Sequence, residues 1–117
     1  MKRALAAGLL LATAAGAQAR DPLAGRVAGR AERCLPGGTD ARLTILDART
    51  LVSRQGRRIW VSHPVGACPG LAAGRTLVIE SASGAYCRND RFRTLTPGLS
   101  IPSASCRMGA FVPYEKR

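Results

Sequence analysis

The chain has 117 residues, of which 46% are hydrophobic, and its 18 basic and 7 acidic residues give a formal net charge of +11. This length fits one small domain and excludes a multidomain enzyme. The charge would attract anionic partners such as nucleic acid, lipopolysaccharide or acidic phospholipid headgroups. GC-rich codon usage is the favoured origin of the charge, because 16 of the basic residues are arginine and no run of five or six like charges occurs.

Residues 1–19 have the layout of a secretory signal peptide. Lys2 and Arg3 precede an apolar run that ends in the small-x-small sequence Ala17-Gln18-Ala19. The run is shorter than the roughly 20 residues that span a bilayer. We therefore expect cleavage before Arg20 and a periplasmic or secreted chain without a transmembrane segment. That chain has 98 residues and a charge of +9, since two of the 18 basic residues and none of the 7 acidic ones precede Arg20.

Residues 20–40 form a lead-in segment. Asp21 is a suitable N-cap and Pro22 a suitable first helical residue, which predicts a short helix. Gly25 and Gly29 weaken it by about 1 kcal/mol each relative to alanine. A frayed helix or a flexible lead-in is therefore expected here.

Short apolar segments alternate with turn residues over 41–113, and 114–117 is expected to be a C-terminal tail. The spacing indicates an all-β domain, a small antiparallel barrel or sandwich of about six to seven short strands. A barrel is favoured because closure removes exposed sheet edges. The expected strands are 42–46, 50–53, 57–65, 76–80, 86–88, 91–95 and 106–112.

The four cysteines are Cys34, Cys68, Cys87 and Cys106. In an exported domain, an even number of cysteines favours disulfides. A zinc site would need close Cys-x-x-Cys pairs, whereas the spacings here are 34, 19 and 19. Three pairings are open, and the expected strand order favours Cys34 with Cys106 and Cys68 with Cys87.

Catalytic motifs are missing from the sequence. No nucleophile elbow accompanies the single histidine, His63, and no Walker loop, dinucleotide fingerprint or paired-histidine zinc motif occurs. We expect no catalytic, cofactor or metal residues and no enzymatic activity, with a small hydrolase using His63 as the third alternative.

The aromatic residues are few and dispersed. We expect Phe92 and Phe111 in the core and either Trp60 or Tyr86 at the surface. An exported chain with so few aromatic residues is not expected to bind nucleic acid. The candidate anion-binding residues are instead arginines on neighbouring expected strands, namely Arg57, Arg58, Arg88, Arg91 and Arg93.

Six short segments carry a resemblance to a known family: Arg33-Cys34, Asp47-Ala48-Arg49-Thr50-Leu51, Gly56-Arg57-Arg58-Ile59-Trp60-Val61, Ala67-Cys68-Pro69-Gly70-Leu71, Tyr86-Cys87-Arg88-Asn89-Asp90 and Ser105-Cys106-Arg107-Met108. The chain resembles a family of short exported bacterial proteins with four cysteines that is classed as a domain of unknown function. The match covers 33–110 and implies that the cysteines are a structural set. It implies no activity, cofactor or site residue.

The leading expectation is a non-enzymatic binding or interaction module of the bacterial cell envelope. Its partner would be an envelope protein or an anionic envelope component. The alternative is a basic anion-binding or envelope-stress protein. An exposed apolar groove would favour the first reading, and a contiguous arginine face would favour the second.

Overall fold

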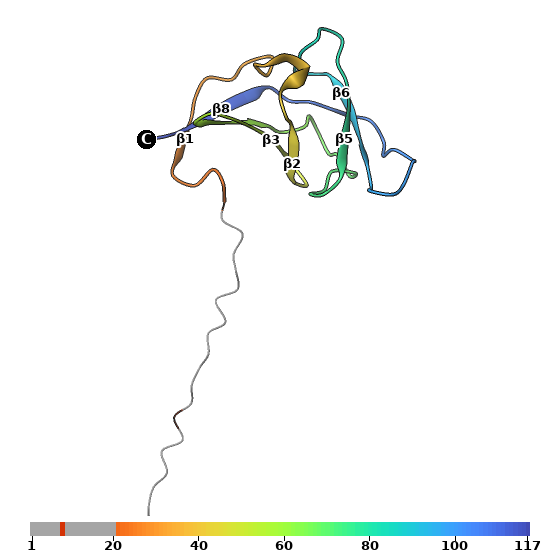
Figure 1. Ribbon diagram of the computed structural model, residues 1–117, viewed down its shortest axis with the longest axis horizontal. Helices are drawn as coiled ribbons and strands as arrows, with labels where there is room; N and C mark the ends of the chain where they lie inside the picture. Colours follow the sequence, from red (N-terminus) through yellow and green to blue (C-terminus); the bar gives the residue numbers. More distant parts are fainter. Residues whose placement is uncertain (1–7, 9–20) are drawn as a thin grey trace, which may run out of the picture.

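The computed structural model describes residue 8 and residues 21–117, shown in colour in Figure 1. The predicted signal peptide and its cleavage point lie outside the described residues. Within them, the chain is an all-β domain of two antiparallel sheets, as the sequence predicts.

The first sheet has five strands in the order β1-β8-β4-β3-β2. Two tight turns connect its central hairpins, and Gly56 at the β3–β4 turn has a φ of 59°, a left-handed conformation that glycine adopts without strain. The C-terminal strand β8 lies between β1 and β4. The strands span Arg26–Ala28 (β1), Thr44–Asp47 (β2), Thr50–Gln55 (β3), Arg58–Ser62 (β4) and Phe111–Lys116 (β8).

The second sheet has three strands in the order β5-β6-β7. They span Thr76–Glu80 (β5), Arg91–Leu95 (β6) and Cys106–Arg107 (β7), and a single 3-10 turn, η1 (Gly38–Asp40), precedes β2. The strands hydrogen bond into two separate sheets, so the domain is not a closed barrel. The preference for a barrel, which rested on the removal of exposed sheet edges, is therefore wrong. Strands β2 and β5 each have a sheet partner on one side only.

Both ends of the chain differ from expectation. The expected N-terminal helix does not form: the Asp21 carboxylate accepts a hydrogen bond from the Leu23 backbone N–H at 2.9 Å and closes a turn, after which β1 begins. Strand β1 pairs with β8 from Arg26 opposite Lys116 to Ala28 opposite Tyr114. The predicted tail 114–117 is therefore mostly part of a strand.

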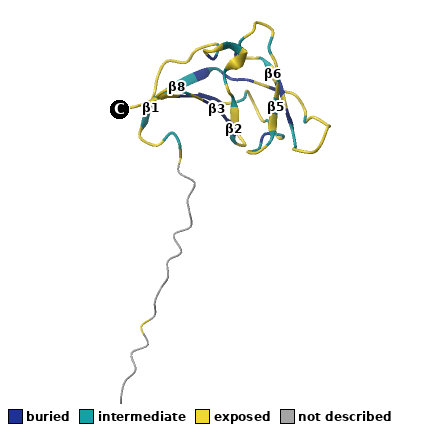
Figure 2. Ribbon diagram, viewed as in Figure 1, coloured by how far each residue is buried: buried dark blue, intermediate teal, exposed yellow. Residues whose placement is uncertain are grey.

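One core fills the space between the two sheets. Phe92 and Phe111 are fully buried in it, as predicted. Trp60 is also buried there, at 4% exposure, so the prediction that Trp60 or Tyr86 is exposed is wrong for Trp60, and Tyr86 is half-buried. The buried residues of this core come from both sheets and from the loops between them (Figure 2).

A second, smaller cluster covers the opposite face of β4. Ile59 and Val61 pack there with Val52, and Leu23 from the lead-in contributes to the cover. Both faces of β4 are therefore buried from Ile59 to Ser62. The predicted alternation of side chains along 57–65 is confirmed. The face that packs into the main core, however, is the one with Trp60 and Ser62, and Ile59 and Val61 lie on the other face.

The disulfides are Cys34–Cys87 and Cys68–Cys106. Both disulfides form as expected, but the predicted pairs, Cys34 with Cys106 and Cys68 with Cys87, are wrong. The segment at Cys34 runs antiparallel to the segment at Cys87, and the flanking Leu35 N–H donates to the Tyr86 carbonyl at 2.8 Å. Local backbone pairing thus brings together two cysteines that the assumed strand order kept apart.

Each disulfide joins a segment next to one sheet to a segment of, or next to, the other sheet. Cys34 precedes β2 and Cys87 precedes β6, while Cys68 follows β4 and Cys106 begins β7. No helix in residues 21–117 is long and apolar enough to cross a membrane.

Candidate functional site

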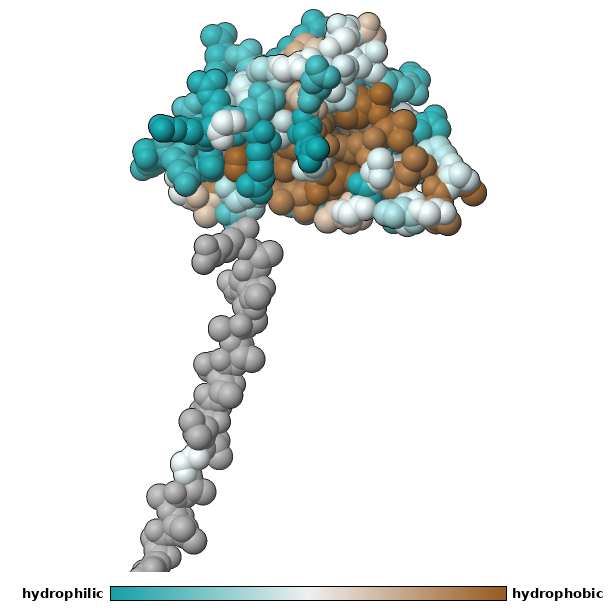
Figure 3. Space-filling view, in the orientation of Figure 1, coloured by the Kyte–Doolittle hydropathy of each residue, from teal (hydrophilic) through white to brown (hydrophobic). Residues whose placement is uncertain are grey.

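A groove of about 550 Å³ lies between β2 and β5, and we name it the seam groove. Leu43 and Ile45 come from the β2 side, and Leu77 and Ile79 come from β5. On each strand the two apolar residues are two positions apart, so they share one face of that strand. In Figure 3 this region is an apolar area on the face that carries β2 and β5.

The walls of the seam groove are only partly covered. Leu43, Leu77 and Ile79 are half-buried at the edge of the main core, whereas Ile45 is buried. No backbone hydrogen bond joins β2 to β5 in residues 21–117. The groove is therefore an opening in the domain at which core side chains meet solvent beside two free strand edges.

Two arginines stand at opposite ends of the seam groove. Arg42 lies just before β2, Arg75 lies just before β5, and both line the groove. The two strands run in opposite directions side by side, which places their starting points at opposite ends (Figure 1). One guanidinium N–H of Arg75 donates to the Gly70 carbonyl at 2.8 Å, which leaves other donors of that group free.

Tyr86 completes the lining of the groove. It follows β5, and its hydroxyl donates a hydrogen bond to the Thr39 carbonyl in η1 at 3.2 Å. Because the adjacent Cys87 is joined to Cys34, this side of the groove is held by both a disulfide and a hydrogen bond. The position of Tyr86 is thus fixed relative to the start of β2.

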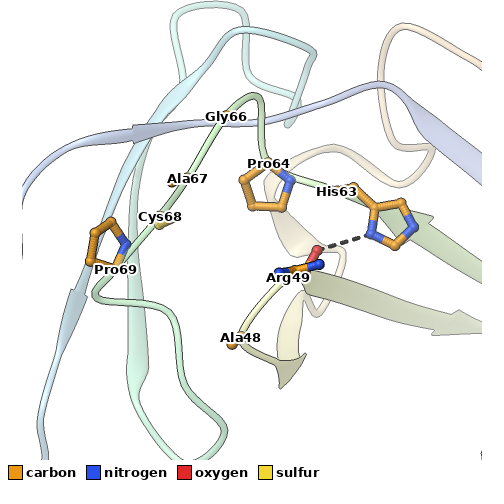
Figure 4. Close-up of a pocket in the computed structure, with 8 residues that line it drawn as sticks. All are labelled: Ala48, Arg49, His63, Pro64, Gly66, Ala67, Cys68 and Pro69. Carbon is orange, nitrogen blue, oxygen red and sulfur yellow. Dashed lines mark hydrogen bonds between the residues drawn. The ribbon is translucent and has the colours of Figure 1, made fainter.

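His63 lies on the rim of a different pocket, of about 540 Å³ (Figure 4). Its Nδ1 is 2.9 Å from the Arg49 carbonyl oxygen. A carbonyl only accepts, so Nδ1 carries the proton and donates. The eight residues that line this pocket include no serine and no carboxylate: Ala48, Arg49, His63, Pro64, Gly66, Ala67, Cys68 and Pro69.

Asp47 lies at the turn beside this pocket. The Arg49 backbone N–H donates to its carboxylate at 2.8 Å, and this bond holds the pKa of Asp47 below its ordinary value. Burial opposes this effect, and the Thr50 hydroxyl and the charges of His63 and Arg49 lower the pKa further. The carboxylate therefore closes the β2–β3 turn.

In residues 21–117, no group of three or more His, Cys, Asp or Glu residues is placed to hold a metal ion.

The five candidate arginines are divided between the two sheets. Arg58 on β4 forms an ion pair with Glu115 on β8, and Arg57 offers its carbonyl to Arg26 at 2.7 Å. Arg91 and Arg93 point outward from β6 in the other sheet. Arg88 is exposed in the loop before β6. The predicted strip is thus split into a group at the β3–β4 turn and a group on the three-stranded sheet.

Within the second group, like charges face each other. Arg91 on β6 is directly opposite Arg107 on β7 and, on its other side, opposite Glu80 on β5. Arg93 is opposite Val78, which is 41% exposed. The outer face of this sheet is basic but interrupted by an acidic and an apolar residue.

Sequence reasoning did not identify the seam groove. Its signal was present, because Leu43 with Ile45 and Leu77 with Ile79 show the two-residue period of a half-buried strand. What the sequence does not show is that these two strands are sheet edges that lie next to each other. That depends on β5 pairing only with β6 and β2 only with β3.

The chain matches no protein-family model, no curated protein and no solved structure. The resemblance to a domain of unknown function therefore stays a prediction. The two disulfides fit an extracellular or otherwise oxidising compartment.

Proposed function

We propose that this chain is a non-enzymatic binding module of the bacterial cell envelope whose ligand occupies the seam groove. The observation that carries the proposal is the apolar lining of a groove open to solvent, with Leu43, Leu77 and Ile79 half-buried at its walls. Its volume of about 550 Å³ is within the range of ligand sites, roughly 300 to 1,000 Å³.

Location supports the same proposal. The N-terminal signal layout and the two disulfides fit export to the periplasm or the medium. The apolar surface at the walls of the seam groove is only partly buried, and its full burial would stabilise the domain by about 25 cal/mol per Å². Binding of an apolar ligand would recover this contribution.

Anion binding by the arginines is the second candidate. It is supported by the outward-pointing Arg91 and Arg93 and by Arg107 on the same sheet. The ion pair of Arg58 with Glu115 and its location in the other sheet weigh against one continuous strip.

A hydrolase built on His63 has less support. The imidazole donates to a backbone carbonyl, whereas a triad histidine is oriented by an acid and faces a nucleophile. The lining of its pocket supplies neither partner.

Binding of the fluorescent probe 8-anilinonaphthalene-1-sulfonate to the folded, oxidised protein tests the proposal. We expect saturable binding at one site and a loss of at least about tenfold in affinity in Leu77→Ser, because this change makes a wall of the groove polar. Val78→Ser is the matched control: Val78 is the next residue on β5 and points to the opposite, solvent-exposed face. Equal binding by both variants and wild type would refute the seam groove as the site.

A further inference from the structure

We propose that the domain docks on the surface of an anionic lipid bilayer through the segment 96–105 between β6 and β7, which we name the docking loop. The tip of the docking loop inserts among the lipids, and arginines at its base contact the headgroups. The docking loop contributes no residue to the lining of the seam groove, so this inference goes beyond the proposed function and does not depend on it.

The docking loop is uncharged and carries exposed aliphatic side chains. Leu99 and Ile101 are 63% and 82% exposed, more than any other large hydrophobic residue in the described part of the chain. No charged residue occurs in the sequence between Arg93 and Arg107. The two aliphatic side chains lie two positions apart on one loop and are not scattered singly over the surface, which indicates an interaction site.

Hydrogen bonds hold the docking loop at both of its ends. The Leu99 N–H donates to the Thr96 carbonyl at 2.9 Å, in a turn where Gly98 has a φ of 82°. The returning arm is fixed to β6, because the Ser103 N–H donates to the Thr94 carbonyl at 2.9 Å and the Ser103 hydroxyl accepts from the Thr94 N–H at 3.0 Å. The loop projects from the end of the three-stranded sheet (Figure 1), and apolar atoms lie at this end in Figure 3.

Arginines lie at the base of the docking loop. Arg93 is exposed on the outer face of β6, close to the point where the loop begins. Arg75 directly precedes β5, whose first residue, Thr76, pairs with Leu95 at the end of β6. The carboxylate of the three-stranded sheet, Glu80, is at the other end of β5. The charge at the end of the sheet that carries the loop is therefore positive.

The order of these groups matches the layers of an anionic membrane. An apolar tip suits the boundary of the acyl chains, and arginines behind it reach the phosphate oxygens while their aliphatic stems stay among apolar groups. Stable attachment to a membrane generally needs two signals, since a single apolar anchor binds only marginally. Each arginine near an anionic surface strengthens binding by about fivefold, and this effect falls off within a Debye length.

The shape of the docking loop fits a bilayer better than a protein partner. Its apolar residues form a projecting tip, and no aromatic residue occurs in 93–107. Protein interfaces are instead broad surfaces whose binding energy comes mainly from buried aromatic and arginine side chains. We therefore assign the exposed Leu99 and Ile101 to insertion into lipid.

The test measures cosedimentation of the exported, oxidised protein with lipid vesicles at about 0.15 M salt. One set of vesicles contains phosphatidylglycerol and phosphatidylcholine in equal amounts, and the other contains phosphatidylcholine alone. We expect the anionic vesicles to bind at least about tenfold more tightly, because two arginines lie at the base of the loop. Equal binding to both sets of vesicles, or binding to neither, would overturn the proposal.

Matched variants separate the apolar tip from the charge. Ile101→Ser should weaken binding to the anionic vesicles at least about fivefold, whereas Val27→Ser, at an exposed valine of β1 in the other sheet, should weaken it less than about twofold. Arg93→Glu should also weaken binding at least about fivefold, and the control Arg30→Glu, next to β1, less than about twofold. If Ile101→Ser binds as well as wild type, attachment is purely electrostatic and insertion of the loop is overturned.

Leu99→Trp gives a direct measure of insertion. The single native tryptophan, Trp60, is 4% exposed, so its emission should not change when the phosphatidylcholine of the anionic vesicles is replaced by a form brominated on the acyl chains. The emission of Leu99→Trp should be quenched by the brominated lipid. An absence of quenching in vesicle-bound Leu99→Trp would overturn the proposal.

Two further measurements separate this inference from its alternatives. If the protein does not bind vesicles but self-associates in sedimentation equilibrium, and Ile101→Ser makes it monomeric, the docking loop is a contact between two copies and membrane docking is overturned. Binding of the fluorescent probe in the seam groove should be the same in Ile101→Ser as in wild type, since the loop does not line the groove. Loss of vesicle binding with retention of probe binding in Ile101→Ser therefore supports both proposals as separate properties.

Discussion

Gly109 packs directly against the carbonyl group of His63, so closely that a Cβ atom at residue 109 would overlap that oxygen. A hydrogen bond beside this contact holds the same two segments together: the buried Ser62 hydroxyl donates to the Gly109 carbonyl at 2.8 Å. The end of β4 and the loop before β8 are thus in backbone contact at a point where only glycine fits.

We expect Gly109→Ala to destabilise the domain by about 3 kcal/mol or more, since the overlap is with backbone that cannot rotate away. Urea unfolding measures the loss. Gly25→Ala is the control: no atom lies within 4 Å of the new methyl group, but φ is 73°, so its cost should be only about 1 to 2 kcal/mol. A smaller loss in Gly109→Ala than in Gly25→Ala would contradict this packing.

The disulfides should contribute similarly to stability. Cys34–Cys87 and Cys68–Cys106 span 53 and 38 residues, which in the chain-entropy model corresponds to about 4 kcal/mol each. Replacing either pair by serines should lower the urea midpoint by a comparable amount. Because each disulfide links the two sheets, full reduction should unfold the domain.

Mapping of unreduced peptides checks the pairing itself. Fragments that contain Cys34 and Cys87 should be recovered joined, and so should those that contain Cys68 and Cys106. Recovery of Cys34 joined to Cys106 would contradict the arrangement of the two sheets.

The strands with local signals were predictable from sequence. The expected segment 50–53 lies within β3, and the expected segments 76–80 and 91–95 match β5 and β6, because each is an apolar or alternating run bounded by turn residues. Long-range pairings were not predictable. Strand β8 pairs with both β1 and β4, and no local pattern records which distant strand is a neighbour.

The predictions of the cysteine pairing and of an exposed Trp60 were wrong for the same reason: both depend on contacts between segments that are distant in the sequence. Cys34 meets Cys87 through an isolated backbone bridge that depends on how the two sheets meet. On β4, both faces are buried, and the face with Ile59 is covered by Leu23 and Tyr114. Alternation alone does not tell which face enters the main core.

Asp47 should make stability depend on pH in the acidic range. The Arg49 N–H lowers the pKa of Asp47 in the folded state, so its carboxylate stabilises the fold above the unfolded-state pKa of about 3.9. This contribution is lost as the pH falls through the lower, folded-state pKa.

The free energy of unfolding of Asp47→Asn, measured from pH 7 to pH 2, tests the sign. The variant should be less stable than wild type at pH 7. The difference should shrink as the pH falls from about 4 through the lower, folded-state pKa of Asp47, below which both side chains are uncharged. A difference that stays constant over this range would show that ionisation of Asp47 is not its cause.

Export predicts a processed N-terminus. The small-x-small sequence Ala17-Gln18-Ala19 should direct cleavage so that the exported chain begins at Arg20. Intact-mass measurement of periplasmic material checks this. Retention of Met1 in that material would mean that the export reading is wrong.

The division of the arginines between the two sheets predicts weak and diffuse anion binding. Arg58 is paired with Glu115, and Arg91 lies on the other sheet, so the five candidate arginines do not form one strip on a single sheet. We therefore expect heparin or lipopolysaccharide to bind at low salt and to be released by moderate salt, since the Debye length is already about 8 Å at 0.15 M.

Charge reversal distinguishes a diffuse surface from a dedicated strip. The double variant Arg58→Glu/Arg91→Glu should lower the salt concentration for elution from heparin by no more than Arg30→Glu/Arg54→Glu, a control with the same charge change at two other exposed arginines. On a diffuse surface the salt dependence follows the number of charges rather than their positions. Tight binding that survives high salt in wild type and in the control, but is lost in Arg58→Glu/Arg91→Glu, would instead establish a dedicated arginine site.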